Sequence, residues 1–329
     1  MATNTSTLLT IEQVADYSAR VIQEVEKAII GKREALNQMM AAFLSSGGHI
    51  LLEDYPGLAK TLIANSFATA LGLEFSRIQF TPDLLPGDIT GGYVFNSSQN
   101  QFQLRRGPVF ANIVLADEIN RASPKTQSAL LEAMQEYQVT MEGESQSLPD
   151  PFIVIATQNP IEYEGTFPMP EAQLDRFMIR LSIGYPSRAE EAEILKRRAE
   201  RKQDDVDLQA VLTPETFLAM RAVVEEVYVD PDVRCYIVDV VAASRRHRQV
   251  VVGASPRGSL ALLKLARAWA AIQGRDFVVP DDIKYFTPLA LTHRLVLEPS
   301  LWGKPRSEET IIAEVMATTS VPVIQEAHE

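Results

Sequence analysis

The residues best suited to chemistry begin with Gly57-Leu58-Ala59-Lys60-Thr61, which stands after a predicted strand and before a predicted helix. In such a loop, backbone N–H groups and the helix N-terminus point at an anion, an arrangement that binds phosphate. Lys60 would then reach the β- and γ-phosphates, and the Thr61 hydroxyl would hold Mg²⁺. Asp54 and Ala59 stand at the two glycine positions of the general pattern. A tight turn that caps a helix therefore remains an alternative.

A second candidate is the pair Asp117-Glu118, which ends the apolar run that starts at Ala111. Acidic residues are disfavoured at the end of a buried strand unless their carboxylates have a functional role. Beside a phosphate loop, Asp117 would hold the metal shell and Glu118 would polarise a water for attack on the γ-phosphate. The alternative is an acidic start to the following loop and helix.

Polar residues also end the strand predicted from Phe152, where Thr157-Gln158-Asn159 precede a proline. The carboxyl ends of parallel strands share one edge of the sheet, which is where α/β proteins bind ligands. Asn159 could therefore orient an attacking water together with Glu118. A plain Asn-Pro turn is the alternative.

Two arginines complete the set of candidates. Arg176 follows a leucine and an aspartate in EAQLDRF, and Arg257 follows a predicted N-cap serine in ASPRG. An arginine donates two parallel hydrogen bonds to phosphate and stays charged. Taken singly, each arginine is better explained by a surface salt bridge.

The elements that must position these residues alternate between strands and helices. Hydrophobic spacing predicts a first helix from about Glu12 to Gly31 and a second from Arg33 to Leu44. Buried strands are predicted at 49–53, 75–80, 111–118 and 151–160, with helices at 61–71 and 124–136 and a hairpin at 138–148. The pattern predicts an α/β fold with a parallel sheet. After Gly184 we expect helices only, and hence a second, all-α domain.

Composition limits the classes of function. The chain has 329 residues, 46% of them hydrophobic, and a formal net charge of −12. This negative net charge argues against nucleic acid as a partner. We interpret the basic runs at 196–202 and 245–248 as solvent-exposed faces of helices. The single cysteine, Cys235, is consistent with a reducing cytoplasm. The N-terminus lacks a secretory signal, and no membrane span is expected.

In their order along the chain, these blocks resemble AAA+ ATPases, and specifically the MoxR family. The resemblance covers roughly residues 25 to 300 and rests on LLEDYPGLAKT, ANIVLADEINRASPKTQSALLEAMQE, PFIVIATQNPIEYEGTFPMPEAQLDRF and GASPRG. It implies a P-loop NTPase parallel sheet, the AAA+ core, followed by an all-α lid. The implied limits are an N-terminal helix at 1–30, the nucleotide-binding domain at 31–185, the lid at 186–304 and a tail at 305–329.

The resemblance also implies residue roles, with ATP and Mg²⁺ as ligands. Lys60 and Thr61 match Walker A, Asp117 and Glu118 match Walker B, and Asn159 matches sensor 1. Arg176 matches an arginine finger that acts on a neighbouring subunit, Arg257 matches sensor 2, and Arg121 is a further basic residue near the subunit boundary. Segment 82–107 resembles the helix-2 insert, and 138–150 the pre-sensor-1 hairpin. The implied nucleotide contacts are Ile29, Ile30, Gly31, Tyr55, Pro56, Gly57, Leu58, Ala59, Lys60, Thr61 and Leu62.

Two structural readings of Asp54 stay open. A residue at a glycine position of the loop is expected to have positive φ, which costs a side chain about 1 kcal/mol, and its carboxylate would weaken ATP binding. Alternatively, the side chain turns outward and caps a neighbouring N–H group, without effect on nucleotide.

The function implied by the resemblance is an oligomeric, hexameric, Mg²⁺-dependent ATPase that remodels or matures a protein partner. Members of this family typically work with proteins that carry von Willebrand factor A domains, some in metal cofactor insertion. The rivals are the motor of a magnesium-chelatase-like complex, a nucleotide-binding scaffold with weak hydrolysis, and a nucleic-acid motor, against which the net charge argues.

Overall fold

The computed structural model describes residues 9–159, 165–301 and 307–322. The helices of the first part are α1 (Ile11–Val25), α2 (Arg33–Leu44), α3 (Lys60–Leu71), α4 (Pro86–Thr90), α5 (Pro124–Glu136) and α6 (Glu171–Leu174). Its strands are β1 (Ile50–Glu53), β2 (Phe75–Gln79), β3 (Gly91–Asn96), β4 (Gln101–Arg106), β5 (Ile113–Asp117), β6 (Gln138–Met141), β7 (Glu144–Ser147), β8 (Ile153–Gln158) and β9 (Ile179–Leu181).

The second part is mainly helical, as the sequence predicts. It contains α7 (Arg188–Arg201), α8 (Pro214–Glu225), α9 (Pro231–Arg246), β10 (Val250–Val252), α10 (Pro256–Ile272), α11 (Pro280–Leu291), β11 (Val296–Leu297) and α12 (Ser307–Thr318). Short 3₁₀ turns lie at Ile119–Arg121 in the first part and at Thr292–Arg294 and Pro299–Leu301 in the second.

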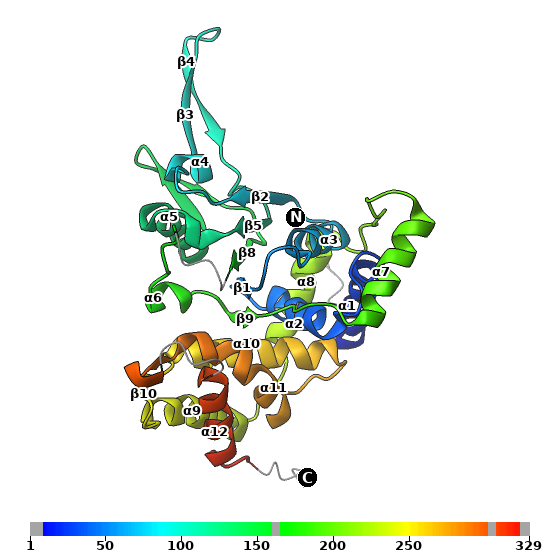
Figure 1. Ribbon diagram of the computed structural model, residues 1–329, viewed down its shortest axis with the longest axis vertical. Helices are drawn as coiled ribbons and strands as arrows, with labels where there is room; N and C mark the ends of the chain where they lie inside the picture. Colours follow the sequence, from blue (N-terminus) through cyan, green and yellow to red (C-terminus); the bar gives the residue numbers. More distant parts are fainter. Residues whose placement is uncertain (1–8, 160–164, 302–306, 323–329) are drawn as a thin grey trace, which may run out of the picture.

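A five-stranded parallel sheet in the order β2-β5-β8-β1-β9 organises the first part (Figure 1). Gln79 pairs in register with Asp117, and Leu52 pairs with Thr157. The carboxyl ends of β1, β5 and β8, the three strands that lead into the candidate residues, therefore meet at one edge, as the alternation of strands and helices predicts.

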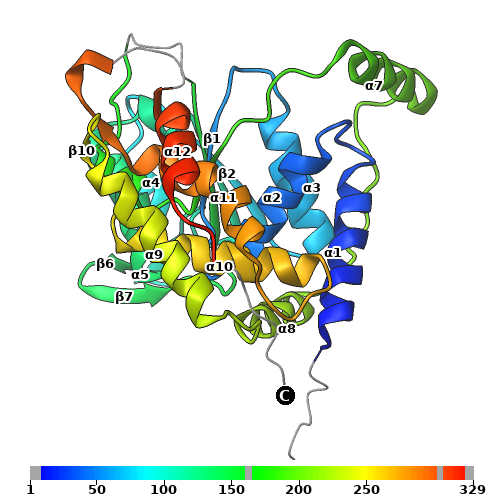
Figure 2. The ribbon, with the colours of Figure 1, turned by 90° about the horizontal axis from the view of Figure 1, so that it is seen from below.

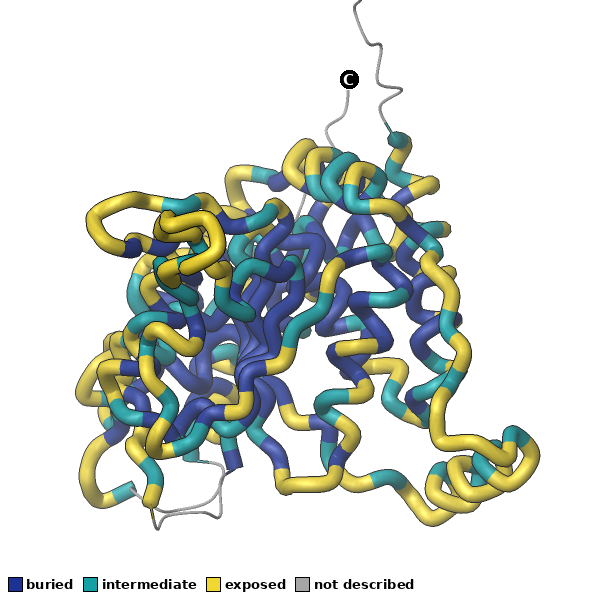
Figure 3. Tube along the Cα trace, turned by 90° about the horizontal axis from the view of Figure 1, so that it is seen from above, coloured by how far each residue is buried: buried dark blue, intermediate teal, exposed yellow. Residues whose placement is uncertain are grey.

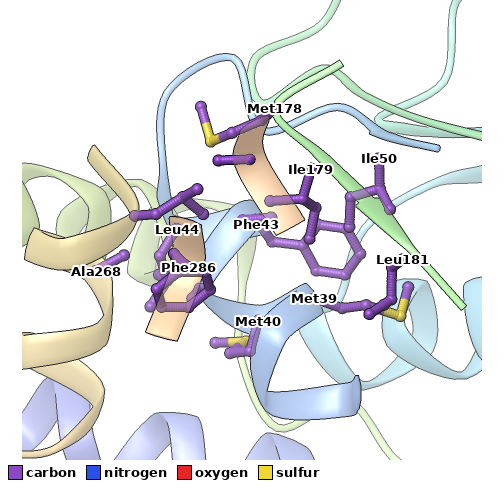
Figure 4. Packing of buried hydrophobic residues seen from close by; sticks show 14 of the residues in the cluster. Met39, Met40, Phe43, Leu44, Ile50, Met178, Ile179, Leu181, Ala268 and Phe286 are labelled. Carbon is purple, nitrogen blue, oxygen red and sulfur yellow. The ribbon is translucent and has the colours of Figure 1, made fainter. Parts of the chain in front are cut away.

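Each face of the sheet has its own core, because successive side chains of a strand point to opposite faces. Leu51, Val114 and Val154 belong to one cluster, which α5 covers with Leu130 and Met134. The neighbouring residues of the same strands belong to a second cluster, together with α1, α2, α3 and the helices after Gly184. In Figure 4, Phe43 of α2 lies next to Ile179 and Ile50 of the sheet, Met39 lies beside Leu181, and Phe286 of α11 lies close to Leu44. One core thus joins the sheet to the C-terminal helices.

Two elements extend from the body. The β3–β4 hairpin projects beyond the sheet in Figure 1, and its Phe95 and Phe102 are exposed and pack edge to face. Helix α7 stands apart in Figure 2 and has no buried residue, which Figure 3 shows as a mostly exposed helix. The hairpin falls within segment 82–107.

The structure corrects two of the elements predicted from the sequence and confirms a third. Helix α1 ends at Val25, six residues before Gly31, because the chain turns through 26–28. The prediction of helices only after Gly184 is wrong, since β10 pairs antiparallel with β11. The β-branched run at 250–252 is itself typical of a strand. The hairpin predicted at 138–148 is confirmed by the pairing of β6 with β7.

Candidate active site

The loop between β1 and α3 takes the shape of an anion cradle. Gly57 has φ +82°, and Ala59 has φ 56° and ψ 22°, the left-handed conformation at the N-cap of α3. Among the described residues no side chain caps α3, so its first backbone N–H groups face the loop. Lys60 Nζ donates to the Asp54 carbonyl at 2.7 Å, and the ring of Tyr55 stacks on that of Tyr185 with centroids 5.8 Å apart.

The side chain of Asp54 connects this loop to residues 182–184. Its carboxylate is buried and accepts hydrogen bonds from Ser182 Oγ (2.7 Å), Ile183 N (2.5 Å) and Gly184 N (3.1 Å). The expectation of positive φ at this position is wrong, because the left-handed residues of the loop are Gly57 and Ala59. The geometry of Asp54 agrees with the alternative, in which its side chain turns outward and accepts hydrogen bonds from neighbouring N–H groups.

The acids after β5 are fixed by β8. Thr157 Oγ1 donates to Asp117 Oδ1 at 2.6 Å and accepts from Glu118 N at 2.8 Å. Glu118 has φ 56° and ψ 49°, a conformation that few residues other than glycine adopt. Strain of this kind is concentrated at functional sites. Asn159 is buried and lies beside both acids on the same cavity.

Three polar residues hold these acids that sequence reasoning did not assign to them. Arg77 Nη2 donates to Asp117 Oδ2 at 2.6 Å. Gln79 Nε2 donates to Glu118 Oε2 at 2.8 Å, and Arg121 Nε lies 3.4 Å from the same oxygen. The available signal was the spacing of Arg77 and Gln79, which places both on one face at the end of β2.

The phosphate loop, both acids, Asn159 and Arg77 line one cavity of about 430 Å³. Its residues are Pro56, Gly57, Leu58, Ala59, Lys60, Thr61, Leu62, Arg77, Asp117, Glu118 and Asn159. A second cavity of about 520 Å³ is lined by Gly31, Ile183, Pro288, Leu289 and Thr292 among others. Of the three residues expected at adenine, only Gly31 lines it. Ile29 is buried in the core, and neither Ile29 nor Ile30 lines either cavity.

The two arginines lie elsewhere. Arg176 and Arg257 line a third cavity, of about 210 Å³, which shares no residue with the cavity of the phosphate loop. Arg176 Nε donates to Gln135 Oε1 at 3.2 Å, and Arg257 Nη1 lies 3.7 Å from Asp175 Oδ2. The resemblance assigns Arg176 to the nucleotide of a neighbouring subunit, and within one copy of the chain both arginines line a different cavity from the phosphate loop and the acids.

Comparison with known proteins agrees with this geometry. Residues 49–179 match the ATPase family associated with various cellular activities (AAA), and residues 242–315 match the AAA lid domain. Chaperone MoxR1 of Mycobacterium tuberculosis is 42% identical over 314 residues, which cover 93% of this chain and 82% of that protein. The chain belongs to the MoxR family of AAA+ ATPases.

Two further relatives span almost the whole chain. The uncharacterised Bacillus subtilis protein YeaC is 47% identical over 316 residues, 96% of this chain and 98% of that protein. A crystal structure of a protein assigned as an ATPase from Cytophaga hutchinsonii superposes with a TM-score of 0.89 and 38% identity, covering 95% and 97% of the two chains. As a MoxR-family member, the protein is an ATP-hydrolysing enzyme.

The residues present fit a magnesium ion bound together with nucleotide. Thr61 and Asp117 line the same cavity as the phosphate loop. Mg²⁺ commonly takes one or two protein oxygens and completes its shell with phosphates and water. No cluster of three or more His, Cys, Asp or Glu suited to a metal occurs among residues 9–159, 165–301 and 307–322. In those same ranges, no helix combines the length and hydropathy that crossing a bilayer requires.

Proposed function

We propose that this MoxR-family ATPase hydrolyses ATP between two copies of the chain and uses the energy to remodel a partner protein. Gly57, Ala59 and Lys60 would bind the phosphates, and Thr61 and Asp117 would hold Mg²⁺, which neutralises charge that develops on the phosphates. Glu118 would polarise the attacking water, and Asn159 would orient it. The nucleotide base would occupy the cavity beside Gly31.

The observation that carries the proposal is the separation of the two halves of the site. The phosphate loop and both acids line one cavity, whereas Arg176 and Arg257 line another that shares none of its residues. Charge on the transferred phosphoryl group is commonly stabilised by an arginine from a second subunit. A ring, for which we propose six subunits, would bring Arg176 and Arg257 of one copy to the nucleotide of the next.

The partner and cofactor remain part of the proposal. We propose a cytoplasmic protein complex with a von Willebrand factor A domain as the target, matured in some cases by insertion of a metal cofactor. Support comes from the family and from the exposed surfaces of α7 and the β3–β4 hairpin, where Leu195 and Phe102 are exposed. We also propose 1–30, 31–185, 186–304 and 305–329 as the functional segments. Each of these segments includes residues outside the described ranges 9–159, 165–301 and 307–322.

A weakly hydrolysing scaffold was suggested by the incomplete P-loop pattern. The geometry of Asp54 argues against that reading, because its carboxylate is bound by Ser182, Ile183 and Gly184 rather than directed at the phosphates. The motor of a magnesium-chelatase-like complex remains the second candidate, and no feature of this site favours it over a chaperone.

The test compares two variants of the same cavity. Glu118→Gln should bind ATP as the unmodified protein does and lose most turnover, whereas Lys60→Ala should lose ATP binding. Turnover by Glu118→Gln at the unmodified rate would refute the assignment of Glu118. The proteins that co-purify with Glu118→Gln, but not with Lys60→Ala, would identify the partner.

A further inference from the structure

A buried arginine of the C-terminal part holds the backbone on both sides of Arg176. The side chain of Arg294 is 3% exposed, and the residue lies in the turn after α11. Its Nε donates to Asp175 Oδ1 at 2.8 Å, immediately before Arg176. Its Nη2 donates to the Phe177 carbonyl at 2.8 Å, and its Nη1 donates to the Met178 carbonyl at 3.2 Å, both after Arg176.

The second oxygen of Asp175 extends this contact to the other arginine. Ser255 Oγ donates to Asp175 Oδ2 at 3.0 Å, and Arg257 Nη1 lies 3.7 Å from the same oxygen. Ser255 is the N-cap of α10, and Arg257 lies in the first turn of that helix. One carboxylate therefore joins Arg294, the segment that carries Arg176 and the start of the helix that carries Arg257.

His293 strengthens the same attachment. Its Nε2 lies 3.0 Å from the Phe177 carbonyl, to which it donates, so that this oxygen accepts from both His293 and Arg294. On the other side, the Arg176 side chain donates to Gln135, and the N–H groups of 175–178 donate to carbonyls of the first part, including Met178 N to His49 at 2.8 Å. The first part therefore holds the N–H groups of this segment, whereas lid residues hold the carbonyls of Phe177 and Met178.

We propose that Arg294 is a positioning residue for the arginines that one subunit presents to its neighbour. The proposal rests on the proposed function, in which Arg176 acts on the nucleotide of the next subunit. Arg294 would touch no nucleotide itself. It would fix the backbone from which Arg176 extends and, through Asp175, the side chain of Arg257, so that both arginines reach the neighbouring site with one geometry.

The contacts of Arg294 go beyond an ion pair with Asp175, because its guanidinium also donates to the carbonyls of Phe177 and Met178. A buried ion pair stabilises a fold little more than well-packed apolar side chains do. Arg294 instead directs three of its donors at the four residues that include Arg176. A displacement of about 1 Å in a catalytic group can cost about 100-fold in rate.

The first test measures turnover and nucleotide binding separately in Arg294→Met. We expect kcat to fall about 100-fold, while the Kd for ATP changes less than about twofold, since the phosphate loop of that subunit is unaltered. The matched control is Arg275→Met, which removes another lid arginine paired with an acid, Asp282, at 2.7 Å. It should leave kcat near the unmodified value. Unmodified turnover by Arg294→Met would overturn the proposal.

The second test uses mixed assemblies, shown to contain both subunits by affinity tags. Arg294→Met mixed with Glu118→Gln should regain activity, because some interfaces then pair an intact Glu118 with a well-positioned Arg176. Arg294→Met mixed with Arg176→Ala should not, because both subunits lack an effective finger. A subunit that is merely misfolded would be rescued by neither mixture, and that result would overturn the proposal.

The reference mixture separates this proposal from the function on which it rests. Arg176→Ala mixed with Glu118→Gln must regain activity if Arg176 acts in trans. Failure of this mixture refutes the trans site, whereas success here with no rescue of Arg294→Met refutes only the role of Arg294.

If Arg294→Met does not assemble, a second variant replaces it. Arg294→Lys keeps the charge opposite Asp175 but cannot span both sides of Arg176. It should show the same rescue pattern, and unmodified turnover would overturn the proposal.

Discussion

Arg77 of β2 donates a hydrogen bond of 2.6 Å to Asp117, the acid proposed to hold Mg²⁺. The pairing crosses from β2 to β5, which are neighbours in the sheet. The side chain of Asp117 is 13% exposed, and its other oxygen accepts from Thr157. The guanidinium therefore occupies a carboxylate oxygen that a divalent cation would also use.

This competition predicts the effect of Arg77→Met. Removing the guanidinium frees Asp117 for the metal, so the Mg²⁺ concentration that half-saturates ATP binding should fall about fivefold. That change corresponds to about 1 kcal/mol, the upper end for a partly exposed ion pair. Fluorescent-nucleotide titration against Mg²⁺ measures it, with Arg20→Met, from an exposed pair in α1, as the control. A higher Mg²⁺ requirement would mean that Arg77 assists binding instead.

Asp54 yields a prediction opposite to the one its place in the P-loop pattern suggests. Asp54→Gly would leave the buried N–H group of Ile183 without its acceptor, which typically costs about 1 to 3 kcal/mol. We therefore expect a lower free energy of unfolding and no tightening of ATP binding. Denaturant unfolding and calorimetric titration of both proteins at fixed Mg²⁺ decide between the readings. Tighter binding with unchanged stability would restore the view of Asp54 as a charge that repels phosphate.

His49 predicts a pH dependence of stability. Its Nδ1 accepts from Val154 N at 3.0 Å, so Nε2 carries the proton and donates to the Met134 carbonyl at 3.2 Å. Burial lowers the pKa of His49 from 6.5 to about 4. Because the unfolded chain takes up the proton first, the contribution of His49 is complete above pH 6.5 and is lost as pH falls towards 4.

The expected slope between pH 4.5 and 6 is about 1 kcal/mol per pH unit from this residue alone. His49→Asn should be less stable at neutral pH, but its free energy of unfolding should vary less with pH by that amount. Urea unfolding at several pH values measures the difference. The other buried histidine, His293, is present in both proteins and cancels. Parallel pH profiles would contradict the assignment.

The sequence predicts the parallel sheet and the phosphate loop well, because both depend on local patterns. The apolar run before Asp117 and the Ser-Pro start of α5 each specify an element within a few residues. The contacts of Arg77 and Arg294 could not be predicted in the same way. Arg77 reaches Asp117 only because β2 lies next to β5, and Arg294 reaches Asp175 across 119 positions of the chain. Strand order and packing of the lid determine these contacts, and neither is encoded in a short window.

Ala59 yields the last prediction, since it adopts the left-handed conformation that the general P-loop pattern leaves to glycine. A left-handed alanine costs roughly 1 to 2 kcal/mol in the folded state, whereas glycine adds about 0.4 to 1 kcal/mol of entropy to the unfolded chain. Ala59→Gly should therefore raise the free energy of unfolding by about 0.5 kcal/mol. The control is Ala222→Gly on the exposed face of α8, which should lower it by about 1 kcal/mol. Equal losses of stability in both variants would mean that the loop at Ala59 relaxes out of the left-handed conformation in solution.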